Sequence, residues 1–186
     1  MSSGLLARPK LPKRDGMSVS PDQFRRALRQ WPSGVSVVTS FSSEPVGLTV
    51  SSFFSVSLVP PLVGVCLDRK SATLPIILAT RLFGVSVLSA GQADLSERFA
   101  GADESVRFQG VPLFATPAAL SPLLAGAVLH LDCRLEAAHE AGDHVLCLGS
   151  IQLALSHPGE PLLFHGSRYH RLAGFGPGHG EPAEIP

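Results

Sequence analysis

The sequence predicts a mainly β protein, a barrel of six or seven strands, mostly antiparallel, with two or three short helices on its outside. Two segments, residues 46–58 and 127–136, alternate apolar and polar side chains with the period of two expected of a half-buried strand. The connections between the predicted strands are short, which favours antiparallel neighbours because parallel strands need long crossovers. At 186 residues, 45% of them hydrophobic, the chain has the size of one globular domain.

The first element is a helix that begins at Ser20-Pro21-Asp22-Gln23, a capping box with proline in the first helical position. The apolar residues that follow recur on one helical face: Phe24, Ala27, Leu28 and Trp31. The basic segment 1–17 and the Gly/Pro-rich segment 174–186 are expected to be disordered tails, so the folded domain spans residues 18–173.

The rest of the chain is expected to consist mainly of strands, at residues 34–40, 46–58, 62–67, 82–88, 127–136, 144–155 and 161–165. Short helices are predicted at 71–80 and 92–99, whereas 101–126 shows little periodicity and reads as a loop. In the strand 127–136 the alternation places Leu129, Leu131, Cys133 and Leu135 inward and His130, Asp132, Arg134 and Glu136 outward. A Gly142-Asp143 turn then makes 144–155 its hairpin partner.

Composition excludes several classes of function. Fifteen basic and fifteen acidic residues give a net charge of zero, which argues against nucleic acid as a partner. The chain has no run of eighteen apolar residues and no secretory signal at its start, so we expect a cytoplasmic protein with no membrane partner. The three cysteines are widely spaced and form no cluster with histidines, so neither a disulfide framework nor a metal site is expected.

Residues 47–53 combine a glycine, small hydroxyls and strand backbone. Thr49 and Ser51 fall on the polar face of the predicted strand, and Ser52 falls on its apolar face. Such an uncharged, hydrogen-bonding surface suits a heteroaromatic ring with several carbonyl and N–H edges. The plainer interpretation, which composition alone favours, is that these hydroxyls face solvent.

The segment Asp68-Arg69-Lys70-Ser71-Ala72-Thr73 follows a buried strand and opens a helix. Backbone N–H groups at a helix start, two hydroxyls and two cations form a suitable environment for a phosphate. An equally simple interpretation is that Asp68 or Ser71 caps the helix and that both cations are solvated. The chain has neither a Rossmann glycine fingerprint nor a P-loop to bind phosphate instead.

Two later positions are ambiguous when taken alone. His144 begins a predicted strand, where an isolated histidine usually faces solvent. Tyr169 is the only tyrosine, and it either stacks on a ligand ring or covers the mouth of the barrel.

In order along the chain, GLTVSSFFSVSLVPPLVGVCL, DRKSAT, FGVSVLSAGQADLSERFAG, VRFQG, GDHVLCLGSI and PLLFHGSRYHRL resemble the flavin reductase family. The family includes the reductase components of two-component flavin-dependent monooxygenases. The resemblance covers residues 20–172. It implies an FMN-binding split β-barrel and a homodimer that holds flavin near the subunit interface.

The resemblance also implies a role for individual residues. Along the isoalloxazine ring it places Thr49, Val50, Ser51 and Ser52, and at the ribityl phosphate Asp68, Lys70, Ser71 and Thr73. Around these it adds Arg107 near the phosphate, Phe99 packing near the flavin, and Gly166 and Tyr169 at the C-terminal end of the site. His144 becomes the catalytic candidate beside the nicotinamide. Many relatives have Asn in place of Asp68, and phosphate repels a carboxylate, so Asp68 is expected to act as a helix cap.

The implied activity is reduction of FMN or FAD by NADH or NADPH, with hydride passing to flavin N5 and the reduced flavin going to a partner monooxygenase. One alternative is a flavin-binding electron-transfer protein on the same barrel, which would make no use of His144 and Tyr169. An oxidase of the pyridoxamine-phosphate oxidase type is a second alternative, but it would need more basic residues than this chain has in order to bind a second phosphorylated substrate. A purely structural barrel would bind no flavin at all.

Overall fold

The computed structural model describes residues 19–101 and 103–172, so the tails predicted at 1–17 and 174–186 lie outside the described residues. The helices there are α1 (Pro21–Leu28), α2 (Thr73–Thr80), α3 (Ala93–Gly101) and α4 (Glu104–Arg107). The strands are β1 (Ser33–Gly34), β2 (Ser36–Phe41), β3 (Pro45–Val50), β4 (Phe54–Ser57), β5 (Leu62–Asp68), β6 (Leu82–Val87), β7 (Leu129–Ala141), β8 (His144–Ser156), β9 (Leu163–His165) and β10 (Arg168–His170). Within this part of the chain, no helix is long and apolar enough to cross a membrane.

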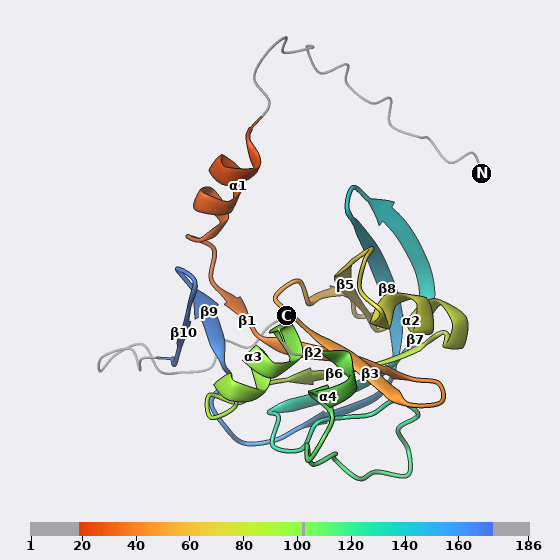
Figure 1. The fold of residues 1–186 in the computed structure, drawn as a ribbon. Helices are drawn as coiled ribbons and strands as arrows, with labels where there is room; N and C mark the ends of the chain where they lie inside the picture. The colour runs from red at the N-terminus through yellow and green to blue at the C-terminus, as the bar shows by residue number, and fades with distance from the viewer. Residues whose placement is uncertain (1–18, 102, 173–186) are drawn as a thin grey trace, which may run out of the picture.

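Seven strands form one sheet in the order β3-β2-β6-β7-β8-β5-β4, and β1, β9 and β10 form a second, smaller sheet. Every strand pairing is antiparallel, and the twisted large sheet curls around its own apolar core (Figure 1). β3 and β4 follow each other in sequence but lie at opposite ends of the strand order. The predicted barrel of mostly antiparallel strands with short helices is confirmed.

The single strand predicted over residues 46–58 is wrong, because β3 ends at Val50 and β4 begins at Phe54 on the far edge of the sheet. Ser52 stabilises the break. Its hydroxyl donates to the Cys66 carbonyl oxygen at 2.7 Å and accepts the Cys66 N–H at 3.2 Å. In the register that pairs Phe54 with Gly64, position 52 lies opposite position 66. The Ser52 hydroxyl therefore takes the place of the backbone hydrogen bonds that a continued β4–β5 pairing would form with Cys66. The predicted core face therefore ends early, and Phe54, Val56 and Leu58 are exposed.

The outward face predicted for the strand 127–136 is also partly wrong. Leu131 is buried as expected, but His130 and Asp132 are each only 1% exposed. The irregular segment after α4 folds over this face: the Leu120 N–H donates to Asp132 Oδ2 at 2.8 Å, and the Phe114 ring stacks on His130 with centroids 4.5 Å apart. His130 and Asp132 therefore form a second buried layer, whereas Arg134 and Glu136 are exposed as predicted.

His130 makes this layer sensitive to pH. Its Nε2–H donates to the Leu124 carbonyl oxygen at 2.7 Å, so Nδ1 accepts from His157 Nε2 at 3.1 Å. Desolvation lowers the pKa of His130 below its ordinary 6.5, and the Leu124 hydrogen bond opposes that shift. The unfolded chain then takes up this proton at a higher pH than the folded chain does.

The free energy of unfolding should therefore fall as pH drops below about 6.5, and should level off once the folded imidazole is protonated. His130→Gln keeps an amide donor for Leu124 without a titrating ring, so it should flatten this decline. Urea unfolding between pH 7.5 and 5 measures the effect. A variant whose stability declines as steeply as that of the wild type would contradict it.

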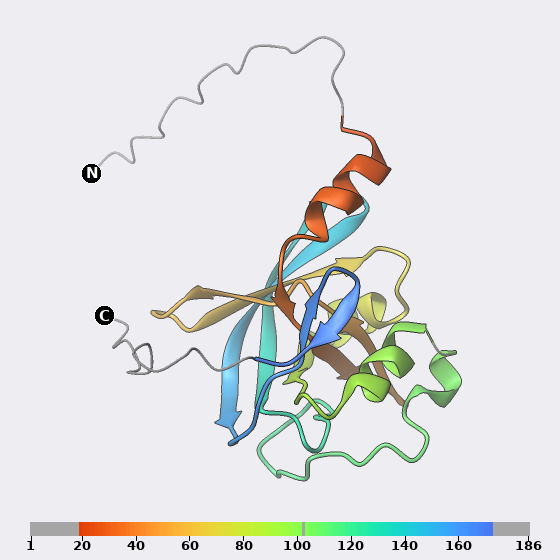
Figure 2. The same ribbon diagram turned by 90° about the vertical axis from the view of Figure 1, so that its left-hand side faces the viewer.

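Helix α1 confirms the predicted capping box: Ser20 Oγ accepts the Gln23 N–H at 3.2 Å, and Gln23 Oε1 accepts the Ser20 N–H at 2.9 Å. Its apolar face, however, is largely exposed, with Phe24 at 58% and Trp31 at 70%. Figures 1 and 2 show why, because α1 stands clear of the barrel. Packing against the barrel of the same chain therefore does not explain why this face of α1 is apolar.

Candidate functional site

A hollow of about 330 Å³ opens between β3, the turn after β5, α3 and α4; we call it the β3–α2 hollow. It brings together six residues that the sequence singled out: Thr49, Asp68, Lys70, Ser71, Phe99 and Arg107. Leu48, Ala100 and Glu104 complete its lining. Strand pairing and helix packing thus unite positions as much as 58 residues apart in the sequence, Thr49 and Arg107.

The turn after β5 is organised by its own side chains. Asp68 Oδ1 accepts the Lys70 N–H at 2.8 Å, and Ser71 Oγ accepts the Leu74 N–H at 3.3 Å. Asp68 therefore caps the turn, while Ser71 caps the first turn of α2. The Ser71 O–H remains available to donate, and the Lys70 ammonium makes no hydrogen bond or ion pair within the described part of the chain.

Arg107 forms the opposite wall and is held firmly. A guanidinium N–H donates to the Gly47 carbonyl oxygen at 2.9 Å, Glu104 lies 3.6 Å away, and the side chain is only 15% exposed. The hollow thus places one anchored cation across from the Lys70 cation and the Ser71 hydroxyl. Charge-assisted donors from several sides are what a phosphate group needs.

Thr49 and Tyr169 meet at Ser96 of α3. The Thr49 hydroxyl donates to the Ser96 carbonyl oxygen at 2.7 Å, and the Tyr169 O–H donates to Ser96 Oγ at 2.9 Å. The tyrosine ring packs against Phe164 with centroids 5.5 Å apart and lines neither this hollow nor the one described below. The Tyr169 hydrogen bond thus fastens β10 to α3, and the Thr49 hydrogen bond fastens β3 to the same helix, which carries Phe99 into the wall. Tyr169 remains a predicted flavin contact.

Three of the expected contact residues turn their side chains away from the hollow. Val50 packs in the barrel core, and Ser52 is bound to Cys66. Thr73 is 1% exposed, and its hydroxyl has no hydrogen-bond partner among the described residues. These three remain predicted flavin contacts, and for Val50 and Ser52 the backbone is the part left to make them.

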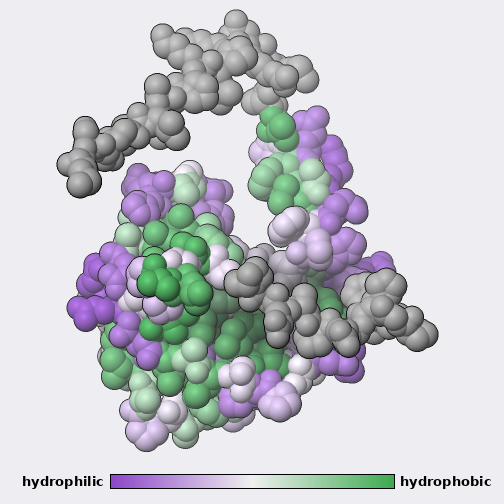
Figure 3. Space-filling model, turned by 180° about the vertical axis from the view of Figure 1, so that it is seen from behind, coloured by the Kyte–Doolittle hydropathy of each residue, from purple (hydrophilic) through white to green (hydrophobic). Residues whose placement is uncertain are grey.

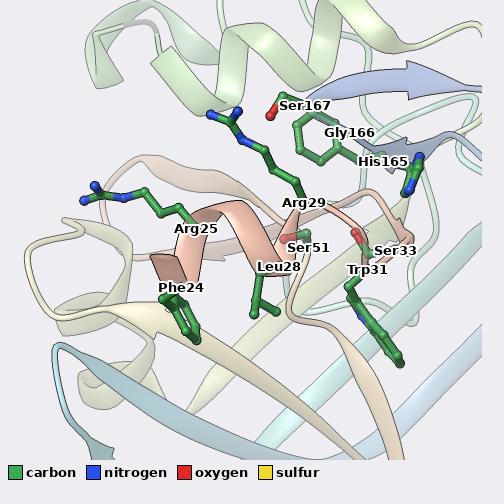
Figure 4. A pocket seen from close by; sticks show the side chains of 11 residues that line it. Phe24, Arg25, Leu28, Arg29, Trp31, Ser33, Ser51, His165, Gly166 and Ser167 are labelled. Carbon is green, nitrogen blue, oxygen red and sulfur yellow. The ribbon is translucent and has the colours of Figure 1, made fainter. Parts of the chain in front are cut away.

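Ser51 and Gly166 line a second hollow of about 380 Å³, between α1 and the β9–β10 hairpin; we call it the α1 hollow (Figure 4). Gly166 and Ser167 both have positive φ, 59° and 64°, as a type I′ hairpin turn requires. The Gly166 N–H donates to the Arg29 carbonyl oxygen at 2.9 Å, which ties the end of α1 to the hairpin. Sequence reasoning missed α1 as part of a site, although the unburied face of a well-capped helix was the signal.

His144 begins β8 opposite Asp68, beside the β3–α2 hollow but not in its lining. Its Nδ1 lies 2.7 Å from Asp143 Oδ1, and its side chain is 42% exposed. The hydrogen bond and charge of His144 lower the pKa of Asp143, which therefore stays a carboxylate that accepts from Nδ1–H. The Arg69 N–H donates to the Asp143 carbonyl oxygen at 3.1 Å and joins this turn to the one after β5.

Comparison with known proteins agrees with this geometry. Residues 28–173 match the family model of the flavin reductase like domain. An NADH-dependent FAD reductase of Streptomyces globisporus is 42% identical over 158 residues, 81% of this chain and 85% of that protein. The reductase component of Thermus thermophilus 4-hydroxyphenylacetate 3-monooxygenase is 34% identical over 153 residues, 81% and 96% of the two chains.

Among solved structures, the S. globisporus NADH:FAD oxidoreductase SgcE6 in complex with NAD and FAD fragments superposes with a TM-score of 0.79. It is 38% identical, over 89% of this chain and 100% of that one. The split β-barrel that the resemblance implied is thereby confirmed. A barrel of this topology and a match over residues 28–173 lead to one conclusion: the chain belongs to the flavin reductase-like domain family.

Proposed function

We propose that the protein transfers hydride from NADH or NADPH to FMN or FAD and releases the reduced flavin to a separate monooxygenase. The observation that carries this proposal is the β3–α2 hollow, where Lys70, Ser71 and Arg107 surround one space beside Thr49. The names of the relatives support the reaction, and the Thermus reductase component supports an oxygenase partner. A cytoplasmic location is proposed with it, because the hydride donor is a coenzyme of the cytoplasm.

The donor set of the hollow fits the phosphate of a flavin nucleotide. Lys70 offers an ammonium without an ion-pair partner in the described residues, and Ser71 offers a hydroxyl proton. The one carboxylate of the turn, on Asp68, is engaged by the Lys70 N–H. The repulsion expected between Asp68 and phosphate is therefore reduced by a local contact.

Bound flavin would supply the hydride-accepting chemistry, and the protein supplies binding and orientation. β3 is an edge strand, so part of its backbone faces away from β2 and is available to the polar edges of a flat ring. Ser51, at the end of β3, adds a hydroxyl, and Tyr169 keeps α3 in place behind Thr49. His144, held through Nδ1 by Asp143, presents Nε2 and would position the nicotinamide; hydride transfer needs no general base.

The proposal includes a homodimer in which a second copy covers the β4–β5 hairpin. Leu58 and Val59 at its turn are 84% and 87% exposed, and Phe54 and Val56 on β4 are 44% and 43% exposed. Figure 2 shows this hairpin projecting from the barrel, and Figure 3 shows apolar residues gathered on the face from which it projects. An exposed apolar surface of this kind is typical of an interface between protein chains.

Analytical ultracentrifugation should therefore find a dimer at micromolar concentration, and Leu58→Lys should shift it toward monomer by placing a charge in the contact. Leu120→Lys, at another exposed leucine remote from this hairpin, is the matched control and should leave the dimer intact. A wild-type protein that sediments as a monomer would refute the dimer.

The function is tested by oxidation of NADH and NADPH, followed at 340 nm, with FMN, FAD or no flavin added. Turnover that requires added flavin supports a reductase that treats flavin as a substrate. Turnover without added flavin would instead indicate a retained cofactor. Flavin binding without any turnover would refute the reductase and favour the electron-transfer protein.

A further inference from the structure

The lining of the α1 hollow is cationic and aromatic. It contains Arg25 and Arg29 and no acidic side chain, together with the rings of Phe24, Trp31 and Phe164 (Figure 4). Its volume of about 380 Å³ lies in the range of small-molecule sites. A hollow with this lining is suited to an anionic ligand that also presents a flat ring.

The two arginines of the lining are not equivalent. Arg25 forms an ion pair with Asp22 at 3.0 Å, which offsets its charge. The Arg29 guanidinium has no hydrogen-bond or ion-pair partner among the residues that the structure describes. Figure 4 shows it pointing toward Ser167, on the side of α1 away from Phe24 and Leu28. The Gly166 N–H fixes the Arg29 backbone against the hairpin, so the Arg29 side chain starts from a defined place at the edge of the hollow.

The α1 hollow and the proposed flavin site meet the same stretch of chain at the end of β3, although their linings share no residue. Ser51 lines the α1 hollow, and Thr49, two residues earlier in the chain, lines the β3–α2 hollow. Two residues of extended chain span about 7 Å, close to the dimensions of a flavin ring system. With the flavin phosphate at Lys70 and its ring along residues 49–52, a nicotinamide stacked on that ring would direct its own phosphates past Ser51 toward the α1 hollow.

We propose that the α1 hollow binds the ADP moiety of the nicotinamide dinucleotide, with Arg29 on its phosphates and Trp31 against its adenine ring. This inference rests on the proposed function, because the dinucleotide enters only as the hydride donor. FAD carries the same ADP moiety, so the test separates the two sources. The aromatic rings of the lining provide contact area for the adenine ring, and the unpaired Arg29 guanidinium binds the negatively charged phosphates.

Trp31 provides a direct readout, because it is the only tryptophan of the chain and it lines the hollow. Titrating ADP-ribose into flavin-free protein should quench its fluorescence saturably, and adenosine, which lacks the phosphates, should bind at least about ten-fold more weakly. Arg29→Gln should raise the Kd for ADP-ribose about 10- to 100-fold, the range of one hydrogen bond to a charged group. Absence of saturable quenching would overturn the proposal.

Arg26→Gln is the matched control, since Arg26 lies on the same helix, is exposed and does not line the hollow. In steady-state assays with FMN as acceptor, Arg29→Gln should raise the KM for NADH by the same factor as the Kd and leave the KM for FMN within two-fold. Equal KM values for NADH in the Arg29 and Arg26 variants would overturn the proposal. So would a raised KM for FAD with a normal KM for NADH, which would assign the ADP moiety to FAD.

The reductase activity and the dinucleotide site can be refuted independently of each other. If the wild type reduces flavin and Arg29→Gln behaves as Arg26→Gln does, the α1 hollow loses this role and the reductase stands. If the wild type reduces no flavin yet ADP-ribose still quenches Trp31 in an Arg29-dependent manner, the hollow keeps its ligand and the reductase fails. The Arg29 side chain makes no hydrogen bond or ion pair within the described residues, so its replacement by Gln should leave the melting temperature nearly unchanged.

Discussion

Replacing Lys70 by Gln and Ser71 by Ala together should raise the KM for FMN about 100-fold or more and leave the KM for riboflavin almost unchanged. The β3–α2 hollow then loses the Lys70 ammonium and the Ser71 hydroxyl, its two donors without another acceptor, and keeps Arg107. Riboflavin has the same ring without the phosphate. The effect should therefore appear as a loss of preference for FMN over riboflavin.

Steady-state NADH oxidation with each flavin measures this preference. Ser71 also caps α2 through the Leu74 N–H, so Lys70→Gln alone is the variant that leaves the cap intact; it should lose about ten-fold in KM for FMN. Arg134→Gln, which removes an exposed cation from β7 that does not line the hollow, should change neither KM. If the double variant still preferred FMN as strongly as the wild type does, the hollow would not be the phosphate site.

Substituting Ala for His144 should raise the KM for NADH about ten-fold or more while the KM for FMN stays within two-fold. Asp143 holds the imidazole through Nδ1, which leaves Nε2 as the polar atom presented near the flavin site. Removal of the imidazole should therefore weaken the binding of NADH and leave the binding of flavin unchanged. Since hydride transfer needs no proton from His144, a residual rate at saturating NADH is expected.

The matched control for this substitution is His139→Ala, since His139 is exposed on the same β7–β8 hairpin and pairs with Leu146 away from the turn. Its kinetic constants should be those of the wild type. Equal increases in the KM values for NADH and FMN in His144→Ala would assign His144 to the general integrity of the site instead of to the nicotinamide.

Local signals in the sequence were sufficient for much of the fold. The capping box at Ser20, the Gly142-Asp143 turn and the helix after Ser71 form as predicted, because each depends on neighbours within a few residues. The cluster of Thr49, Lys70 and Ser71 was expected only through the resemblance to the flavin reductase family, and the structure brings the three residues into one hollow.

The features that the sequence did not predict depend on contacts between residues far apart in the chain. The alternation in 46–58 continues through Ser52, and only the pairing with Cys66 on β5 shows that the chain changes sheet edge there. His130 looked solvent-facing because the segment that buries it has no periodicity of its own. Nothing near Tyr169 in the sequence indicated Ser96 as its hydrogen-bond partner. In each case the deciding contact joins residues 14 or more positions apart.

The most direct test of the account is anaerobic mixing of the protein with NADH and FMN, while absorbance is followed at 340 and 450 nm. If the protein is a flavin reductase, NADH and oxidised FMN should disappear together, one for one, at a rate that saturates with FMN and exceeds the rate without protein. Flavin that binds to the protein but keeps its absorbance at 450 nm when NADH is added would contradict the account.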